Sequence, residues 1–296
     1  MLAPHFRRSA MPRWTLGLFV LTWLGCATTR PAAPSGQETF TSVEGGAGKL
    51  RVSDGGRGGT PVVFVHGLGA DLEVWRAQLD HVRASRRAVA YDQRGHGGSQ
   101  PASDGVYTFE ALAEDLERVV SALGLERFVL VGHSMSGNVI SAYAARHPEK
   151  LAALVYADAA GDASQAPQEM KDWFNKPPEG YGPAQVKEEF AQMLGPKARP
   201  GTREHVLASV GRVDPTTVVA LRRAMGAFSP RPGLDRYTGP RFAIEAEGAA
   251  EENPFTASRS IPGVVTTTVP DVSHWLMMDD PQGFNRALDA VLSQVP

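Results

Sequence analysis

The sequence contains very little cysteine and has no excess of basic charge. Cys26 is the only cysteine among 296 residues, so the chain cannot form an internal disulfide and its fold does not depend on oxidation. The formal net charge is −2, which lacks the basic excess that indicates nucleic-acid binding. These features favour a soluble protein that acts on a small neutral molecule, and the length suffices for one large α/β domain.

Metal-binding and nucleotide-binding motifs are also missing. The sequence has no HExxH motif, no cluster of His and Cys at ligand spacing, no EF-hand loop and no P-loop, so we expect neither a metal nor a cofactor. The turn 67–72, followed by Asp92, is faintly similar to a dinucleotide-binding turn. However, Leu72 stands where a third glycine is needed for close packing of the helix on the strand, so we rank this interpretation low.

Acidic residues are absent before Glu38, and this end of the chain carries a targeting pattern. Three arginines precede the apolar run 14–24, which is too short to span a bilayer comfortably. Basic residues before a short apolar run are typical of a secretory signal. The signal ends at Cys26 and resembles a bacterial lipoprotein signal, in which the cysteine is lipidated and becomes the mature N-terminus. Ordinary secretion with an incidental Cys26 and an uncleaved anchor are the alternatives.

We therefore expect residues 1–26 to be a lipoprotein-like signal peptide and residues 27–38 to be a flexible tether. The resemblance implies export, either to the bacterial cell envelope as a membrane-anchored lipoprotein or as a periplasmic or secreted protein. The segment 39–160 then alternates strands with helices, which predicts a mostly parallel sheet flanked by helices on both faces. This alternation stops in 161–237, which is mostly helical, and resumes in 238–296. We expect the helical segment to form a cap inserted between two core strands.

The boundaries of the individual elements follow from apolar periodicity and from the turn residues between the runs. The predicted strands cover 39–43, 49–53, 62–65, 87–92, 128–131, 151–157, 241–245 and 264–269. The predicted helices cover 71–84, 109–123, 135–147, 168–174, 184–193, 203–210, 215–228 and 281–293. Thr108 is the expected N-cap of the helix 109–123.

The most informative stretch is 129–137. A β-branched strand ends at Gly132, Ser134 follows two residues later, and an Ala-rich helix comes next. This G-x-S-x-small pattern predicts a nucleophile elbow, a sharp strand-to-helix turn that exposes the serine hydroxyl at the sheet edge. Small residues are needed because a Cβ at Gly132, or bulk at Ser136, would collide with neighbouring backbone. An incidental serine at a strand–glycine–helix junction is the alternative.

Two further motifs precede the elbow in chain order. A His-Gly pair opens the segment 66–69 after one predicted strand, and a D-x-R-G-H-G-x-S motif occupies 92–99 after the next. With the elbow, this ordered set resembles the α/β-hydrolase superfamily over residues 39–296, and more narrowly its capped, single-domain, esterase-like members. The resemblance implies an α/β-hydrolase fold and structural roles for His66, His96 and His133.

A serine hydroxyl near neutral pH needs a general base. His274 is the candidate among eight histidines, because it follows the last predicted strand and precedes the final helix. The general-base histidine occupies this loop in similar hydrolases. A loop histidine with a purely structural role is the alternative.

An acid must accept the Nδ1–H of His274 and stabilise the imidazolium, and two residues are candidates. Most relatives carry an Asp shortly after the strand that follows the cap, which here falls near Ala249, with Glu247 close by. A second position known in the superfamily lies directly after the strand that follows the nucleophile helix, where Asp158 stands. We favour Asp158, with Glu247 as the runner-up.

The backbone N–H groups of Leu68 and Met135 are the expected oxyanion donors.

Large apolar side chains in the cap predict a pocket for a small to medium apolar substrate, although some of them must bind the cap to the sheet. These cap residues are Trp173, Phe174, Tyr181, Phe190, Met193, Met225 and Phe228. The sequence thus predicts a hydrolase of carboxylic esters or related acyl compounds that forms an acyl-enzyme on Ser134. A cofactor-free perhydrolase or C–C bond hydrolase, and a catalytically silent binding protein on the same fold, are the alternatives.

Overall fold

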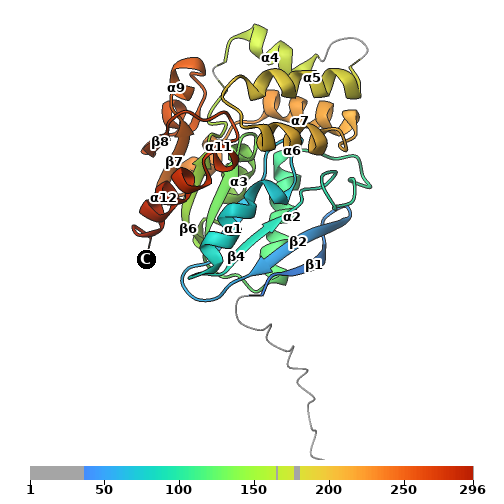
Figure 1. The fold of residues 1–296 in the computed structure, drawn as a ribbon. Helices are drawn as coiled ribbons and strands as arrows, with labels where there is room; N and C mark the ends of the chain where they lie inside the picture. Colours follow the sequence, from blue (N-terminus) through green and yellow to red (C-terminus); the bar gives the residue numbers. More distant parts are fainter. Residues whose placement is uncertain (1–36, 165, 177–180, 296) are drawn as a thin grey trace, which may run out of the picture. The chain divides into compact units, whose positions relative to one another are not determined.

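The computed structural model describes residues 37–164, 166–176 and 181–295. The expected signal, 1–26, and tether residues 27–36 lie outside the described residues. In the described part of the chain, eight strands form a single sheet with helices around it (Figure 1). No helix of these described residues combines the length and apolar character needed to cross a membrane.

The sheet has the strand order β1-β2-β4-β3-β5-β6-β7-β8. The first two pairings, β1 with β2 and β2 with β4, are antiparallel, and the remaining neighbours are parallel. The prediction of a mostly parallel sheet is therefore confirmed, with every strand end within two residues of the expected position. The strands are β1 (Thr39–Glu44), β2 (Lys49–Gly55), β3 (Val62–Val65), β4 (Ala88–Tyr91), β5 (Phe128–His133), β6 (Leu151–Ala157), β7 (Arg241–Ala246) and β8 (Val265–Val269).

Most helices also lie where the sequence predicts them. The exception is 71–84, where a 3-10 turn precedes a shorter α-helix because Asp71 caps the turn by accepting a hydrogen bond from Glu73 N. Thr108 caps its helix as expected. The helical elements are η1 (Leu72–Trp75), α1 (Arg76–Arg83), α2 (Phe109–Ala122), α3 (Ser136–Arg146), η2 (Pro148–Lys150), α4 (Gln168–Asn175), α5 (Pro183–Leu194), α6 (Pro200–Val210), α7 (Pro215–Ala227), α8 (Arg231–Arg236), α9 (Ala249–Glu252), α10 (Ala257–Ser260), α11 (Leu276–Asp279) and α12 (Pro281–Leu292).

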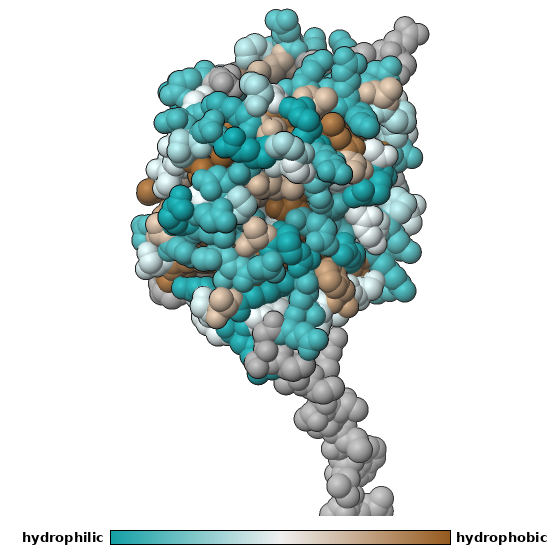
Figure 2. All heavy atoms as spheres, viewed as in Figure 1, coloured by the Kyte–Doolittle hydropathy of each residue, from teal (hydrophilic) through white to brown (hydrophobic). Residues whose placement is uncertain are grey.

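Each face of the sheet has its own hydrophobic core, because alternate residues of a strand point to opposite sides. On one face Phe64 lies in a cluster with Leu79 of α1 and Leu288 of α12. On the other face Val65 lies in a cluster with Leu116 of α2. Burial on both faces accounts for the nearly continuous apolar strands. On the outer face shown in Figure 2, hydrophobic residues form only separate patches among hydrophilic ones.

Helices α4 to α7 separate β6 from β7 in the sequence and form a layer at the top of the view in Figure 1. This layer is the cap. Helix α8 also falls within the segment 161–237 that the sequence assigns to the cap, but it packs on the core helix α3. The two backbones approach so closely that a Cβ at Gly233 would lie 2.1 Å from the carbonyl oxygen of Ser141.

The cap is joined to the core through Asp71, which is buried. Its carboxylate lies 3.1 Å from His205 Nε2 and accepts hydrogen bonds from Ser209 Oγ at 3.1 Å and Arg212 Nη2 at 2.7 Å. Burial by itself raises the pKa of Asp71, but the hydrogen bond and charge of His205 hold that pKa well below its usual range. These bonds attach α6 to the loop that follows β3, next to the site described below.

The start of the described chain is held by Glu38. Its carboxylate accepts hydrogen bonds from Arg76 at 2.8 Å, Arg83 at 3.0 Å and Ser53 Oγ at 2.5 Å. Burial raises the pKa of Glu38, but these three donors together lower it to about 2. Glu38, which the sequence places at the end of the tether 27–38, is therefore part of the folded domain.

Candidate active site

Ser134 lies in the sharp turn between β5 and α3. Its φ of 55° is in the left-handed region, which is uncommon for a residue with a side chain. The backbone approaches itself closely on both sides of the turn. A Cβ at Gly132 would lie 2.6 Å from the carbonyl oxygen of Ser136, and a Cβ at Gly137 would lie 2.1 Å from that of Ala160. The structure thus has the sharp turn and the crowding of small residues that the pattern predicts.

The three sequence motifs meet behind this turn in a buried polar network. Ser136 Oγ donates to the carbonyl oxygen of His66 at 2.6 Å and accepts from Gln93 Nε2 at 3.2 Å. The backbone N–H of Gln93 donates to His66 Nε2 at 3.0 Å, and His66 Nδ1 lies 2.7 Å from the carbonyl oxygen of Gly67. Burial lowers the pKa of His66 to about 4, so its ring is neutral and bonds through both nitrogens. Ser136 at the second small position therefore connects the motifs.

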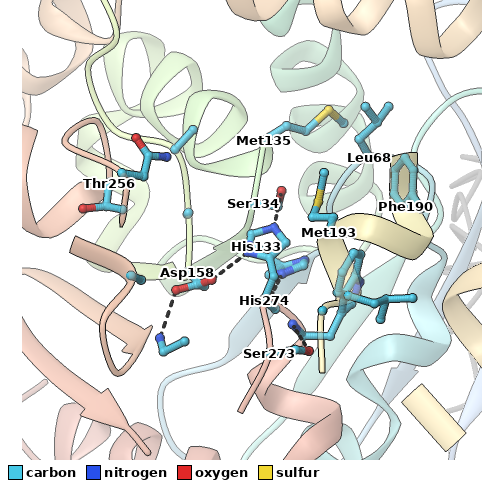
Figure 3. Close-up of a pocket in the computed structure, with 18 of the residues that line it drawn as sticks. Leu68, His133, Ser134, Met135, Asp158, Phe190, Met193, Thr256, Ser273 and His274 are labelled. Carbon is cyan, nitrogen blue, oxygen red and sulfur yellow. Dashed lines mark hydrogen bonds and ion pairs between the residues drawn. The ribbon is translucent and has the colours of Figure 1, made fainter. Parts of the chain in front are cut away.

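Three side chains from distant parts of the chain form one hydrogen-bonded row (Figure 3). The Nε2 atom of His274 lies 2.9 Å from Ser134 Oγ, and its Nδ1 atom lies 2.6 Å from Asp158 Oδ2. The other carboxylate oxygen, Oδ1, accepts from the backbone N–H of Ala246 at 2.9 Å. Because a carboxylate only accepts, Nδ1 of His274 carries the proton and Nε2 is free to accept from the serine hydroxyl.

Asp158 and Glu247 follow the ends of the neighbouring strands β6 and β7, but only Asp158 reaches His274. Its φ of 43° turns the chain sharply at the strand end, and its side chain is 8% exposed. The side chain of Glu247 is exposed at the edge of the same cavity. The nearby Glu245 is buried and accepts from Ser258 N at 2.9 Å.

His133, the last residue of β5, connects the loop of His274 to the strand that ends directly before Ser134. Its Nε2 lies 2.9 Å from the carbonyl oxygen of His274, and the two ring centroids are 4.7 Å apart. Burial lowers the pKa of His133 well below its usual range, so the ring is neutral and donates from Nε2. His133 thus has the structural role that the resemblance implies.

Comparison with known proteins agrees with this fold. A family model described as the alpha/beta hydrolase fold matches residues 60–196. The structure of a thermophilic esterase from Thermogutta terrifontis is similar with a TM-score of 0.71 and 26% sequence identity, over 86% of this chain and 98% of that chain. The chain has the α/β-hydrolase fold.

Two curated relatives overlap with this chain to different degrees. The sn-1-specific diacylglycerol lipase ABHD11 of Mus musculus is 27% identical over 260 residues, which cover 78% of this chain and 80% of the lipase. The non-heme chloroperoxidase CPO-A1 of Kitasatospora aureofaciens is 43% identical over 90 residues, which cover only 30% of this chain and 32% of that protein.

Leu68 and Met135 both line the cavity that contains Ser134. In the part of the chain that the structure describes, neither backbone N–H is taken up by a protein acceptor. The assignment of these two N–H groups to an oxyanion site stays a prediction from the sequence.

The cavity has a volume of about 730 Å³, a size suited to a small or medium ligand. Of the large cap residues singled out from the sequence, Phe174, Phe190, Met193 and Met225 line it. Phe228 instead packs on Phe109 of the core, with ring centroids 5.2 Å apart. The side chain of Trp173 lies outside the described part of the chain.

Two charged residues of the cavity wall, Glu189 of α5 and Arg222 of α7, were not predicted from the sequence. They are far apart in the sequence, and charged residues on a cap helix are usually solvated. Only the packing of the two helices reveals that both side chains face the same cavity.

Proposed function

We propose that this protein is a serine hydrolase that cleaves carboxylic esters or related acyl compounds through an acyl-enzyme on Ser134. The observation that carries the proposal is the row from Ser134 Oγ through His274 to Asp158, with distances of 2.9 Å and 2.6 Å. A hydroxyl beside a neutral imidazole whose other nitrogen donates to a carboxylate is an activated nucleophile.

In the first step, Ser134 Oγ attacks the carbonyl carbon of the ester while His274 Nε2 takes the hydroxyl proton. A C–O bond forms, and the carbonyl π electrons move to oxygen. Asp158 stays ionised and stabilises the imidazolium through its bond to Nδ1. The N–H groups of Leu68 and Met135 bind the developing oxyanion, and loss of one such donor costs about 3 kcal/mol of transition-state stabilisation.

In the second step, the imidazolium of His274 returns its proton from Nε2 to the departing alkoxide. The carbonyl re-forms, the C–O bond to the alcohol breaks, and the acyl group remains on Ser134. Water then enters, His274 takes one of its protons, and the resulting hydroxide equivalent attacks the acyl carbon. Ser134 leaves with the proton from His274, and the carboxylic acid is released.

The relatives support this proposal, since one is described as an esterase and another as a diacylglycerol lipase. The test is hydrolysis of p-nitrophenyl butyrate by the wild type and by Ser134→Ala, which we expect to lose about 10⁴-fold or more in kcat. Ser121→Ala is a matched control, because its exposed hydroxyl bonds only to Glu117 on the same helix. A Ser134→Ala variant that keeps wild-type turnover would contradict the proposal.

A perhydrolase is the second candidate, because the chloroperoxidase relative is 43% identical over its matched segment. The same acyl-enzyme would then transfer its acyl group to hydrogen peroxide instead of water and release a peracid. Product analysis of butyrate esters with and without added peroxide separates the two activities, since a hydrolase forms only butyrate in both cases.

A further inference from the structure

The cavity wall opposite the core contains an ion pair. Arg222 Nη1 lies 3.1 Å from both carboxylate oxygens of Glu189, and both residues line the cavity that contains Ser134. The Arg222 side chain is only 2% exposed, whereas that of Glu189 is 29% exposed. A ligand in the cavity would therefore meet mainly the carboxylate, with the guanidinium behind it.

The surroundings of the pair are mostly apolar. On α7, Val218 and Met225 stand four residues before and three residues after Arg222, and both line the cavity. Tyr181 completes the cluster, because its hydroxyl donates to Glu189 Oε2 at 2.6 Å and its ring centroid lies 5.1 Å from Arg222 Cζ. Burial and the Glu189 carboxylate raise the pKa of Tyr181 to about 12, so this hydroxyl keeps its proton.

Packing of the cap does not by itself require such a pair. Burying the charge of Arg222 costs desolvation free energy, and apolar residues of similar volume are often as stabilising as a buried ion pair or more so. A charged pair within an apolar cavity wall therefore points to recognition of a ligand. Because Glu189 is the exposed member of the pair, it would repel a carboxylate ligand. A neutral group can donate a hydrogen bond to Glu189 without bringing an unpaired charge into the cavity.

We propose that Glu189, held in place by Arg222, binds a neutral group that can donate a hydrogen bond, such as a primary amide or a hydroxyl, at the far end of the substrate. The substrates would then be esters in which an apolar segment separates this group from the scissile carbonyl. This inference rests on the proposed function, because it concerns the part of the substrate remote from Ser134.

The test uses three p-nitrophenyl esters of equal heavy-atom count. Their acyl chains end in a carboxamide (5-amino-5-oxopentanoate), an isopropyl group (5-methylhexanoate) or a carboxylate (glutarate). The same three esters are also made with acyl chains one methylene shorter and one methylene longer, so that the distance between the scissile carbonyl and the terminal group is varied. Dissociation constants are measured by calorimetry on the Ser134→Ala background, which keeps the esters intact, and kcat/KM is measured on the active protein.

We expect the affinity of the amide ester relative to the isopropyl ester to fall about tenfold in Glu189→Leu/Arg222→Met, the scale of a hydrogen bond to a charged group. The single variant Glu189→Gln is isosteric and serves if the double variant does not fold. In this variant the affinity for the carboxylate ester should rise about tenfold, because the negative charge of Glu189 no longer repels it. The control is Glu114→Leu/Arg118→Met, which removes an exposed ion pair of the same 3.1 Å separation on α2.

Unchanged affinity ratios in the cavity variants, or changes matched by the control, would overturn the inference. The proposed function fails separately, through absence of ester turnover and of Ser134 labelling by a fluorophosphonate. A protein that prefers the amide ester without cleaving it would keep the binding assignment and lose the hydrolase assignment.

Discussion

Replacing Asp158 with Asn exchanges one carboxylate oxygen for an amide nitrogen at the end of the row. In the wild type, Oδ1 accepts from the backbone N–H of Ala246 at 2.9 Å and Oδ2 faces His274 Nδ1 at 2.6 Å. The Ala246 N–H will retain the oxygen of the Asn side chain, so the NH₂ group is turned toward His274. Nδ1 must then accept, the proton moves to Nε2, and Nε2 can no longer take the proton of Ser134.

A histidine held in the wrong tautomer reduces kcat by about 10⁴-fold, or about 5 kcal/mol. The assay is steady-state hydrolysis of p-nitrophenyl butyrate, with a thermal unfolding curve to show that the variant is folded. The control is Glu247→Gln, whose exposed side chain does not reach His274, and we expect its kcat to stay within about twofold of the wild type. This reasoning would be refuted if Asp158→Asn kept more than about a tenth of the wild-type kcat. It would also be refuted if the kcat of Glu247→Gln fell as far as we expect for Asp158→Asn.

Two predictions concern stability. Gly137→Ala should lower the free energy of unfolding in urea by about 1–3 kcal/mol, because its Cβ would lie 2.1 Å from the carbonyl oxygen of Ala160. Gly201→Ala on α6, where a Cβ meets nothing within 4 Å, should cause no loss, and equal effects at both positions would contradict the crowding argument. Glu38→Gln should cost about 1–2 kcal/mol at pH 7, since it removes a hydrogen-bonded charge. The pKa of Glu38 is about 2 in the folded protein and 4.5 when unperturbed, so its contribution is present above pH 4.5 and is lost as the pH falls toward 2. If the difference in free energy of unfolding between Glu38→Gln and the wild type stayed constant from pH 7 down to pH 2, the role of Glu38 would be contradicted.

Most of the sheet could be predicted from the sequence because its strands are short apolar runs bounded by turn residues. The strand 151–157 is observed with the expected ends, and the strand before the elbow is extended by only two residues. Helix α8 was not predicted as a separate element, since six residues that begin with Arg-Pro-Gly carry no helical periodicity. Its position depends instead on the close approach of Gly233 to α3.

Those residues of the candidate site that lie in a short sequence motif or follow a predicted strand could be predicted. Ser134 stands in a motif with a steric reason for each small residue, and His274 follows from chain order. The acid was ambiguous because β6 and β7 are neighbours, so the residues after both strands come near the same loop. The φ of 43° at Asp158, which turns its carboxylate toward His274, has no sequence signature. The pair of Glu189 and Arg222 is 33 residues apart and depends entirely on how two cap helices pack.

Covalent labelling tests the central claim most directly. The folded protein is incubated with a fluorophosphonate, its intact mass is measured, and the modified peptide is mapped. We predict a single phosphonyl adduct on Ser134, formed much more slowly in a His274→Ala variant because the hydroxyl then lacks its base. A folded wild-type protein that gains no adduct, or gains it at another residue, would contradict the account.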